Sequence, residues 1–479
     1  MRSGNDMKLG IKKTGLRKIG IKSIREGITH GIKNKKQLIT GLILACLMMT
    51  GTLPQEVYAG SLMKSEPPSD AAGKMAAQAV SEVASGVQKL VSMALEKTNT
   101  AEEAGENKAE EKARRYDISL GFAGDICFGD NYIPMQHLKA IGSEDISDGI
   151  DPRYIKIMKG MDLMWINNEF VYSLRGAPLP GKAWTFCGDP AHVSYLKDLG
   201  VDIVGLANNH TFDFGEESFL DTLSTLEDAG IPYVGAGRTM EQAEAPVYLQ
   251  ARGFKIAYVA ASRAEYTIYT PEATDTKPGI LWCYDNTRFL ESIRTAAANA
   301  DFVIALPHWG VEHSTELEDA QIDGAHAYID AGADAVIGAH PHILQGIEYY
   351  KGKPIMYSLG NFWFDDYDID TLVAELHIKG KRANSTTSAK EAASKGATQE
   401  DASPETASAG NGSAEDAARE DSPLKDAEIE LKLYPGTQTG VYTGLADTEE
   451  WKSRVLGDLE NISVNVNIDE DGVVHPDDQ

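Results

Sequence analysis

Short hydrophobic runs alternate with amphipathic stretches through the middle of the chain, from residue 116 to about residue 380. Seven of these runs have the length and composition of buried strands. They begin at Ile118, Asp162, Val201, Lys255, Asp301, Ala333 and Pro354. Between several of them, apolar residues recur at helical spacing. The pattern predicts strands that are separated by helices.

The segment 215–230 shows the helical spacing clearly. Phe219, Leu223 and Leu226 fall on one face, and Gly230 is well suited to end the helix. The segment 319–332 has a similar pattern. Strands that alternate with helices are typical of layered α/β domains. The sequence therefore predicts an α/β domain over residues 116–380.

The pattern is lost between residues 381 and 422, which contain no aromatic residue and no Val, Ile, Leu or Met. Such a segment cannot bury enough apolar surface to offset the entropy that is lost when it is ordered. We therefore interpret 381–425 as a disordered, low-complexity insertion. Strand-like sequence returns at 427–435 and 461–468. We expect residues 426–479 to supply strands that complete the interrupted domain.

A basic stretch, an apolar stretch and a small-residue site follow one another over residues 1–59. Residues 1–37 are rich in Lys and Arg, the apolar run covers 38–51, and Val57 and Ala59 suit a cleavage site. The apolar run falls short of the ~20 residues of a comfortable membrane span. This order predicts a signal peptide, or a short signal-anchor if it stays uncleaved, and lipidation at Cys46 is a third alternative. In each case we expect an exported protein that is secreted or anchored to the membrane.

Residues 60–115 are rich in Ala, Glu, Lys and Ser, and Val80, Val83, Val87 and Leu90 recur within them at helical spacing. We interpret this segment as a stalk between the membrane and the domain. A helix that binds a partner is the alternative. Either interpretation keeps the domain near the membrane through its N-terminal segment.

The chain is acidic, with 72 Asp and Glu residues against 45 Lys and Arg and a formal charge of −27. An acidic surface repels phosphates, which argues against nucleic acid as the main partner. Of the four cysteines, Cys46 lies in the predicted signal, which leaves Cys127, Cys187 and Cys283. An odd number of cysteines does not indicate a disulfide framework, and these three could form one bridge at most.

Side chains that can bind metal or move protons follow five of the predicted strands. Sites in α/β sheets form where strands end and loops begin. Carboxylate, amide oxygen and imidazole are ligands of Mn, Fe and Zn, and a pair of such ions can polarise a phosphoryl oxygen. The pattern predicts a site for one or two divalent metal ions. In chain order the residues are Asp125; Asn168 and Glu169; Asn208, Asn209, His210 and Asp213; His308 and His313; and His340 and His342.

Each of these residues, taken alone, has a structural alternative. Asp125 precedes a glycine-containing turn, and the Asn-Asn-His stretch could cap a helix. We expect His313 and His326 to lie on the surface or on a helix and not to bind metal. The hypothesis of a metal site rests on all five strand ends, which carry such residues in order along the chain.

Five longer motifs carry a resemblance to a known family. They are GDICFGD, NNEF, GLANNHTFDFG, PHWGVEH and GAHPHILQGIEYYKGKPIMYSLGNFWFD. With them, the chain over about 116–378 resembles the CapA (PGA-cap) proteins of bacterial poly-gamma-glutamate capsule synthesis, which are similar to the calcineurin-like metallophosphoesterases. The resemblance implies a metallophosphoesterase-like layered sandwich, with two central sheets flanked by helices, in a protein that is attached to the membrane and faces outward.

The metallophosphoesterase pattern also implies roles for matching positions. His210 would stabilise or protonate the leaving group as the catalytic residue. The pattern expects a histidine two residues after its first aspartate, and this chain has Cys127 there, so that one ion or a weak second site would fit as well. The implied metal ligands are Asp125, Glu169, Asn209, His308, His340 and His342. Candidates to support these side chains are Asn168, Asn208 and Asp213.

In function, the resemblance implies a component of capsule synthesis that helps to export, anchor or process poly-gamma-glutamate at the cell surface. Its implied partners are the anionic polymer or the membrane proteins of capsule synthesis. Two alternatives remain open. One is an extracytoplasmic metal-dependent hydrolase of a phosphoester or a related bond, in which His210 helps the leaving group depart. The other is a non-catalytic scaffold with a vestigial site.

Overall fold

The computed structural model describes residues 115–477 except 266–268, 382–423 and 425–426. These residues all belong to the unit Ala113–Gln479. The predicted signal segment (1–59) and nearly all of the predicted stalk (60–115) and insertion (381–425) lie outside the described residues. Within the part that is described, no helix combines the length and the apolar character that crossing a bilayer requires.

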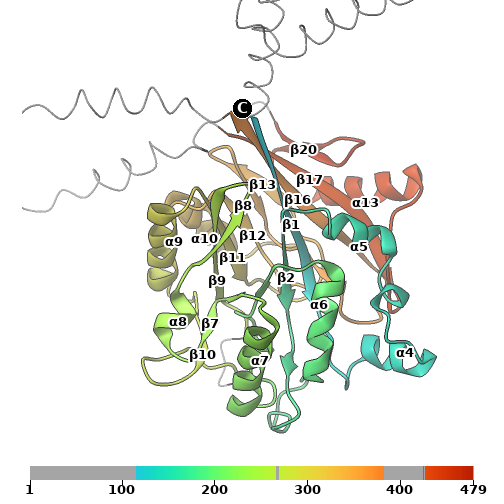
Figure 1. The fold of residues 1–479 in the computed structure, drawn as a ribbon. Helices are drawn as coiled ribbons and strands as arrows, with labels where there is room; N and C mark the ends of the chain where they lie inside the picture. Colours follow the sequence, from blue (N-terminus) through green and yellow to red (C-terminus); the bar gives the residue numbers. More distant parts are fainter. Residues whose placement is uncertain (1–114, 266–268, 382–423, 425–426, 478–479) are drawn as a thin grey trace, which may run out of the picture. The chain divides into compact units, whose positions relative to one another are not determined.

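The larger of two central sheets has ten strands (Figure 1). In it β1, β2, β5 and β6 run parallel, whereas β16 and β17 are antiparallel to their neighbours. The path across this sheet is β19 (Val466–Ile468), β20 (Val473–Pro476), β17 (Glu428–Thr439), β16 (Ile369–Lys381), β1 (Arg115–Ile126), β2 (Leu163–Asn168), β5 (Ile203–Gly205) and β6 (Tyr233–Val234), with β15 (Asn361–Trp363) beside β1 and β18 (Tyr442–Leu445) beside β17.

The smaller central sheet has six strands. Its inner strands are parallel and its edge strands antiparallel. The order is β13 (Ile347–Tyr350), β14 (Lys353–Met356), β12 (Ala335–Ile337), β11 (Phe302–His308), β9 (Phe254–Ser262) and β8 (Val247–Ala251). Two short pairs lie apart from the main sheets: β3 (Val171–Tyr172) with β4 (Cys187–Gly188), and β7 (Ala236–Gly237) with β10 (Gly279–Ile280).

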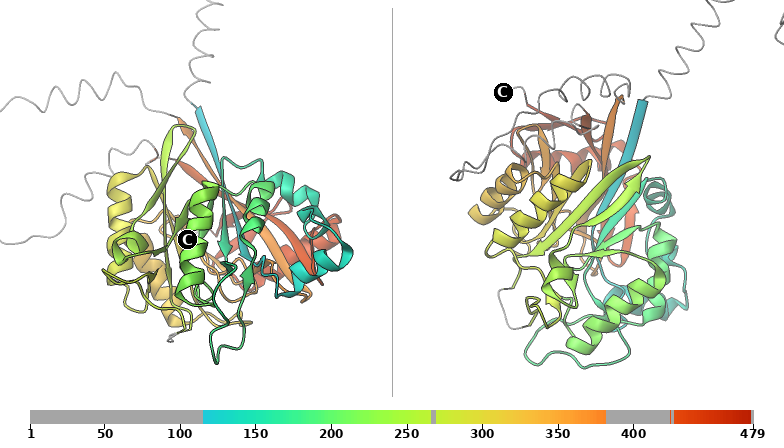
Figure 2. Two further views of the ribbon diagram at one scale, coloured as in Figure 1. Left: turned by 60° about the horizontal axis from the view of Figure 1, so that its bottom comes forward. Right: turned by 60° about the vertical axis from the view of Figure 1, so that its left-hand side comes forward.

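Helices cover the outer faces of both sheets (Figures 1 and 2). Those on the larger sheet are α4 (Ile133–Ile141), α5 (Pro152–Met158), α6 (Val193–Leu199) and α7 (Glu216–Ala229). Those on the smaller sheet are α8 (Met240–Glu244), α9 (Thr287–Asn299) and α10 (Asp319–Asp330). The short 3-10 helices η1 (Ile146–Asp148) and η2 (Pro190–His192) lie in connections. The predicted fold class, two central sheets flanked by helices, is confirmed.

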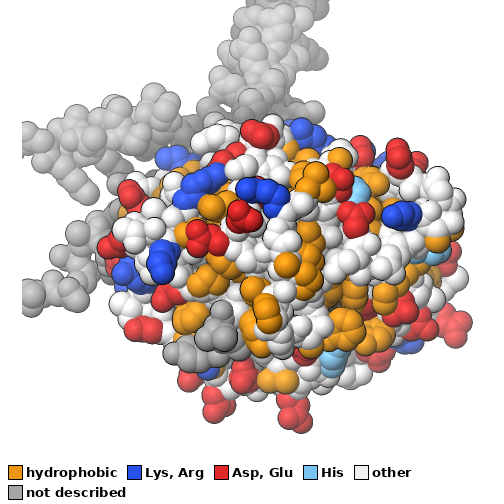
Figure 3. Space-filling model, turned by 90° about the horizontal axis from the view of Figure 1, so that it is seen from below, with side chains coloured by type: hydrophobic (Ala, Val, Ile, Leu, Met, Phe, Trp, Pro, Cys, Tyr) orange, Lys and Arg blue, Asp and Glu red, His pale blue; other side chains and the backbone are white. Residues whose placement is uncertain are grey.

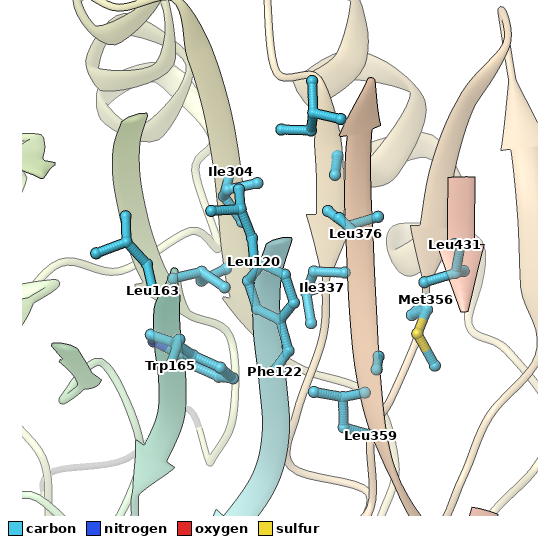
Figure 4. Close-up of a cluster of buried hydrophobic side chains, with 14 of the residues drawn as sticks. Leu120, Phe122, Leu163, Trp165, Ile304, Ile337, Met356, Leu359, Leu376 and Leu431 are labelled. Atoms are coloured by element: carbon cyan, nitrogen blue, oxygen red, sulfur yellow. The ribbon is translucent and has the colours of Figure 1, made fainter. Parts of the chain in front are cut away.

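Successive side chains of each strand point to opposite faces of its sheet, and the apolar ones form three buried layers. Leu120 of β1 and Trp165 of β2 share a cluster with Ile304 of β11 and Ile337 of β12, so this cluster fills the space between the sheets (Figure 4). Met164, next to Trp165 in the chain, belongs instead to the cluster that joins the larger sheet to its helices. A third cluster joins the smaller sheet to its own helices. The strands are therefore buried on both faces, as their apolar runs predict.

The helix predicted over 215–230 is confirmed as α7. Phe219, Leu223 and Leu226 are buried on its inner face. Gly230 takes the left-handed conformation at the C-cap, with φ of 71°.

Beyond the insertion, β17 pairs with β16 along most of its length, from Gln438 beside Ile369 to Glu428 beside Lys379. The same region contains α13 (Glu449–Asn461), which the strand-like pattern does not predict. Thr448 caps this helix, because its side chain accepts a hydrogen bond from the backbone N–H of Trp451. The helix packs on β17 and β19.

Two glycines bring the end of β1 into direct backbone contact with the segment that leads into β15. A Cβ added at Gly124 would lie 1.8 Å from the carbonyl oxygen of Gly360. The N–H of Asp125 donates to that oxygen at 2.9 Å. The pairing between β1 and β2 also shifts register at this point, between Ala123 and Asp125. The contact fixes the position of Asp125 beside Asn361.

We expect Gly124→Ala to lower the free energy of unfolding by about 1–3 kcal/mol or more, because the new methyl group overlaps a backbone oxygen that cannot move aside. Gly457→Ala is the matched control. Gly457 lies inside α13, where an added Cβ meets no atom within 4 Å, and alanine favours a helix by roughly 0.5–1 kcal/mol over glycine. Denaturant unfolding of the full chain measures the change in free energy of unfolding for both variants. Effects of the same sign would contradict the proposed contact.

Candidate metal centre

The carboxyl ends of the central strands bring the sequence-predicted residues together at the lower side of Figure 1. Because β1, β2 and β5 run parallel in one sheet, and β9, β11 and β12 in the other, the strands of each group open into loops at a common edge. Seven of these residues are buried, namely Asp125, Glu169, Asn209, His210, His308, His340 and His342, whereas His313 is exposed.

Two carboxylates lie next to each other where β1 and β2 end. The side-chain amide of Asn167 donates to Asp125 Oδ1 at 2.7 Å and to Glu169 Oε2 at 3.3 Å. The remaining oxygens, Asp125 Oδ2 and Glu169 Oε1, are buried and have no hydrogen-bond partner among the described residues. Each faces an imidazole nitrogen instead. His342 Nδ1 lies 3.3 Å from Asp125 Oδ2, and His308 Nε2 lies 3.4 Å from Glu169 Oε1.

His308 is the last residue of β11 and brings an imidazole from the smaller sheet to the carboxylates of the larger one. Its Nε2 lies 2.8 Å from Asn209 Oδ1. Its ring lies 4.8 Å from the ring of His340, measured between centroids. The candidate site therefore spans the two sheets.

The turn after β12 holds two histidines in an unusual backbone conformation. His340 and His342 have φ of 101° and 60°, in the left-handed region that residues other than glycine rarely adopt. His342 Nδ1 lies 2.7 Å from Asn361 Oδ1, which fixes the orientation of its ring. Backbone strain of this kind is typical of functional sites and persists where the surrounding structure enforces it.

The ligand-type atoms of these residues form two groups that share Glu169. Glu169, His308 and His340 offer atoms within 4.8 Å of one another, and so do Asp125, Glu169 and His342. A carboxylate that belongs to both groups could bridge a pair of ions, as two-metal sites require. With Asn209 beside the first group, the residues can supply ligands for one or two cations.

Unpaired buried atoms show that these residues fit a metal ion. Leaving a buried polar atom without a partner costs about 1–3 kcal/mol. Asp125 Oδ2, Glu169 Oε1 and His340 Nδ1 are three such atoms, and all belong to residues of the two groups. A cation among them would give each a partner.

Electrostatics lead to the same conclusion. Burial raises the pKa of Glu169 well above its usual range, and the charge of Asp125 raises it further. Burial acts upward on the pKa of Asp125 as well, but the imidazole of His342, 3.3 Å away, outweighs burial and holds the pKa of Asp125 below its usual value. Burial lowers the pKa of His308 to about 3 and that of His340 well below its usual range. Both imidazoles are neutral at neutral pH, which is the form that binds metal.

Comparison with known proteins identifies the family. The family described as "Bacterial capsule synthesis protein PGA_cap" matches residues 119–366. The chain belongs to this family. It is 31% identical over 268 residues to the PGA biosynthesis protein CapA of Bacillus subtilis. The aligned region covers 55% of this chain and 68% of that protein. It is also 36% identical over 177 residues to the capsule biosynthesis protein CapA of Bacillus anthracis. That aligned region covers 36% of this chain and 42% of the Bacillus anthracis protein.

Among solved structures, a phosphatase from Mycoplasma pneumoniae matches with a TM-score of 0.34 and 13% identity, over 56% of this chain and 89% of that one. The architecture of this PGA_cap family member rests on its own two sheets and three buried layers.

His210 and Asp213 form a hydrogen-bonded pair beside the ligand groups. His210 Nδ1 lies 2.7 Å from Asp213 Oδ2, and the imidazole packs against the ring of Phe186 at 4.5 Å between centroids. The second oxygen of Asp213 accepts a hydrogen bond from Lys182 Nζ at 2.7 Å. Lys182 also donates to the backbone carbonyl of Asn209 at 2.5 Å. This buried lysine therefore connects the His210 pair to Asn209.

Three residues of the site escape the sequence analysis of this family member: Asn167, Lys182 and Asn361. Asn167, not its neighbour Asn168, contacts Asp125 and Glu169, because alternate residues of β2 point to opposite sides. Asn168 instead donates from Nδ2 to the carbonyl of Phe170. Residues two apart along a strand point to the same side. Asn167, two positions before Glu169, could therefore have been identified from the sequence.

Asn208 lies between the ends of β2 and β5. Its Nδ2 donates to Asn167 Oδ1 at 3.2 Å and to the carbonyl of Asn168 at 3.0 Å. Its Oδ1 accepts a hydrogen bond from the backbone N–H of His210 at 3.1 Å. Asn208 thus ties the strand that carries Asn167 to the turn that carries His210.

Cys127, where the resemblance to metallophosphoesterases led us to expect a histidine, belongs to none of the ligand groups found among the residues described. Its side chain is buried in the cluster between the larger sheet and its helices, and its Sγ accepts a hydrogen bond from the N–H of Gly129 at 3.4 Å. Burial raises the pKa of its thiol well above the usual range, which disfavours the thiolate that binds metal. Cys127, Cys187 and Cys283 are all free thiols.

Hydrophobic side chains are exposed on loops near the strand ends. They are Leu174 (78% exposed), Trp184 (64%), Tyr367 (54%) and Val311 (49%). Figure 3 shows this face of the molecule, with hydrophobic side chains near its middle and acidic ones mostly toward its edge. The loops around the site therefore offer apolar contacts to a molecule that approaches it.

We expect Mn²⁺ to raise the Tm of the full chain relative to the protein in chelator, because an ion that binds the folded state alone stabilises it, by about 2.7 kcal/mol at 100 times the Kd. His308→Ala should lose most of this rise. His326→Ala should keep it, because His326 pairs with Glu348 outside the ligand groups. Thermal unfolding with and without Mn²⁺ measures the difference. An equal rise in His308→Ala would contradict the assignment.

Proposed function

We propose that this PGA_cap family member works at the cell surface in the synthesis, export or anchoring of poly-gamma-glutamate, through a metal-dependent hydrolase site for a phosphoester or a related bond. Family membership supports the first part of the proposal, and the ligand groups at the strand ends support the second. The signal predicted over residues 1–59 supports an exported protein, either secreted or anchored in the membrane by its N-terminal segment.

The observation that carries the hydrolase proposal is the sharing of Glu169 by two ligand groups. Mn, Fe and Zn are the candidate metals, because they accept mixed carboxylate, amide and imidazole ligands. When bound, one or two such ions would polarise a phosphoryl oxygen and lower the pKa of a water molecule. The residues proposed to hold them are Asp125, Glu169, Asn209, His308, His340 and His342.

His210 is the proposed proton-transfer residue. Asp213 occupies Nδ1 of the ring, which leaves Nε2 for the reacting group, as in other sites where a carboxylate orients a histidine. Burial lowers the pKa of His210, whereas the charge of Asp213 acts in the opposite direction. The carboxylate can therefore stabilise the imidazolium that gives its proton to a leaving group. Lys182 holds Asp213 in position by occupying its other oxygen.

The proposed partners are the anionic polymer and the membrane proteins of capsule synthesis. A formal charge of −27 opposes direct contact between this protein and a polyanion. A cation in the site would offset that repulsion locally. The same charge disfavours nucleic acid as a partner.

A non-catalytic scaffold with a vestigial site is the alternative, and the cysteine at position 127 is the observation that favours it. The scaffold and the hydrolase differ in whether the family member turns over a substrate.

We expect the metal-loaded full chain to hydrolyse a generic phosphodiester such as bis-p-nitrophenyl phosphate. His210→Ala should lower kcat by about 10²–10⁴-fold, the usual contribution of a general acid or base, with a smaller effect on KM. His326→Ala serves as the control and should match the unaltered protein. Steady-state kinetics with and without chelator test this. Turnover that survives both chelator and His210→Ala would exclude the proposed site as its source.

We expect the full chain to restore surface poly-gamma-glutamate in a Bacillus subtilis strain that lacks its own CapA. Glu169→Gln should fail to do so, because it removes the charge shared by both ligand groups. Immunoblotting confirms equal expression, and surface polymer is quantified on intact cells. Restoration by the strain's own CapA but not by this chain would count against the capsule role. Restoration by Glu169→Gln would support the scaffold.

A further inference from the structure

A third group of ligand-type atoms lies at the mouth of the site. Glu312, His340 and His342 offer atoms within 4.8 Å of one another. The two histidines are buried, whereas Glu312 is exposed. This group shares His340 with the group that contains His308, and it shares His342 with the group that contains Asp125. The three groups are thus linked in a ring, since each has one residue in common with each of the others.

The loop that carries Glu312 is tied to the turn that carries the two histidines. At its start, the N–H of Trp309 donates to the carbonyl of Ala339 at 3.0 Å. After Glu312, the N–H of His313 donates to the carbonyl of Pro341 at 2.8 Å. Glu312 is therefore held over the histidine turn on both sides, although its side chain reaches solvent.

A buried atom within this group lacks a partner. His340 is 4% exposed, and its Nδ1 has no hydrogen bond within the part of the chain that the structure describes. A buried, neutral imidazole nitrogen of this kind is a ready metal ligand. Its presence in two of the three groups means that an ion near Glu312 would use a side chain that already belongs to the centre.

The resemblance to metallophosphoesterases implies one more ligand for the group that contains Asp125, and Glu312 shares His342 with that group. The metallophosphoesterase pattern has a histidine at the position of Cys127, and the thiol of Cys127 lies in none of the ligand groups. The group is left with Asp125, Glu169 and His342. Glu312 reaches the same His342 from the solvent side.

We propose that Glu312 is a metal ligand at the mouth of the site, where its carboxylate takes the place of the histidine that Cys127 replaces. This inference rests on the proposal that the site holds metal. If two divalent ions bind, three carboxylates including Glu312 would leave the centre with one positive charge. That charge suits an anionic group such as a phosphoester, and it arises although the protein as a whole is acidic.

Metal titration of the full chain tests the proposal. We expect Glu312→Gln to weaken binding of the more weakly held Mn²⁺ at least about tenfold, since even the partners of metal ligands contribute 10- to 100-fold to affinity. Glu316→Gln is the matched control, because Glu316 is exposed on the same loop but belongs to no ligand group. Isothermal titration gives the affinities, and elemental analysis of the desalted protein gives the stoichiometry.

The outcomes separate the two proposals. Mn²⁺ affinities in Glu312→Gln equal to those of the unaltered protein would overturn the role of Glu312 and leave the metal site intact. No Mn²⁺ binding by the unaltered protein would overturn the metal site itself, and the role of Glu312 with it. Glu316→Gln with the same loss as Glu312→Gln would show a general effect of loop charge and would also overturn the proposal.

A spectroscopic measurement tests whether Cys127 is a ligand after all. A thiolate bound to Co²⁺ gives a charge-transfer band in the near ultraviolet, whereas carboxylate and imidazole ligands do not. We expect the Co²⁺-loaded protein to lack this band and Cys127→Ser to bind Co²⁺ as the unaltered protein does. A band that disappears in Cys127→Ser would assign the position to Cys127 and overturn the substitution by Glu312.

Discussion

Two carboxylates buried side by side determine what the centre of this protein can be. Asp125 and Glu169 repel each other in a medium that screens charge poorly, and the amide of Asn167 can satisfy only one oxygen of each. Of the other two oxygens, Glu169 Oε1 faces His308, which burial keeps neutral. Asp125 Oδ2 faces His342, 3.3 Å away. A positive charge between the two carboxylates relieves the repulsion and gives both oxygens a partner. The charge of Asp125 also adds to the effect of burial in raising the pKa of Glu169.

The fold meets the demand for a cation by dividing the ligands between its two sheets. The larger sheet delivers the carboxylates at the ends of β1 and β2, and the smaller sheet delivers His308, His340 and His342 at the ends of β11 and β12. Neither sheet alone carries a complete ligand group that includes Glu169. The distance between the groups therefore depends on the layer of side chains packed between the sheets, in which Leu120 and Ile304 take part. Interiors packed to this density do not deform easily, so the core sets the geometry of the site.

Much of the fold could be predicted from the sequence because its signals are local. The α7 helix has its buried stripe and its glycine cap within sixteen residues, and most ligand candidates follow directly on apolar strands. What could not be predicted depends on tertiary packing. Asn361 reaches His342 only because β15 pairs with the end of β1. Lys182 lies in a loop without periodic pattern, and its ion pair with Asp213 joins segments that nothing in the sequence brings together.

The same physics bears on whether the site is vestigial. A scaffold that had lost its metal would keep two buried carboxylates side by side at a cost in stability, because Glu169 would have to hold a proton or else repel Asp125. The chain keeps both carboxylates. It also keeps His210, Asp213 and Lys182 in one hydrogen-bonded system that holding a metal does not require. The cysteine at position 127, in place of the histidine that the resemblance implies, changes the ligand set, but the two buried carboxylates still require a cation. A working metal centre therefore accounts for more of these buried polar groups than a scaffold does.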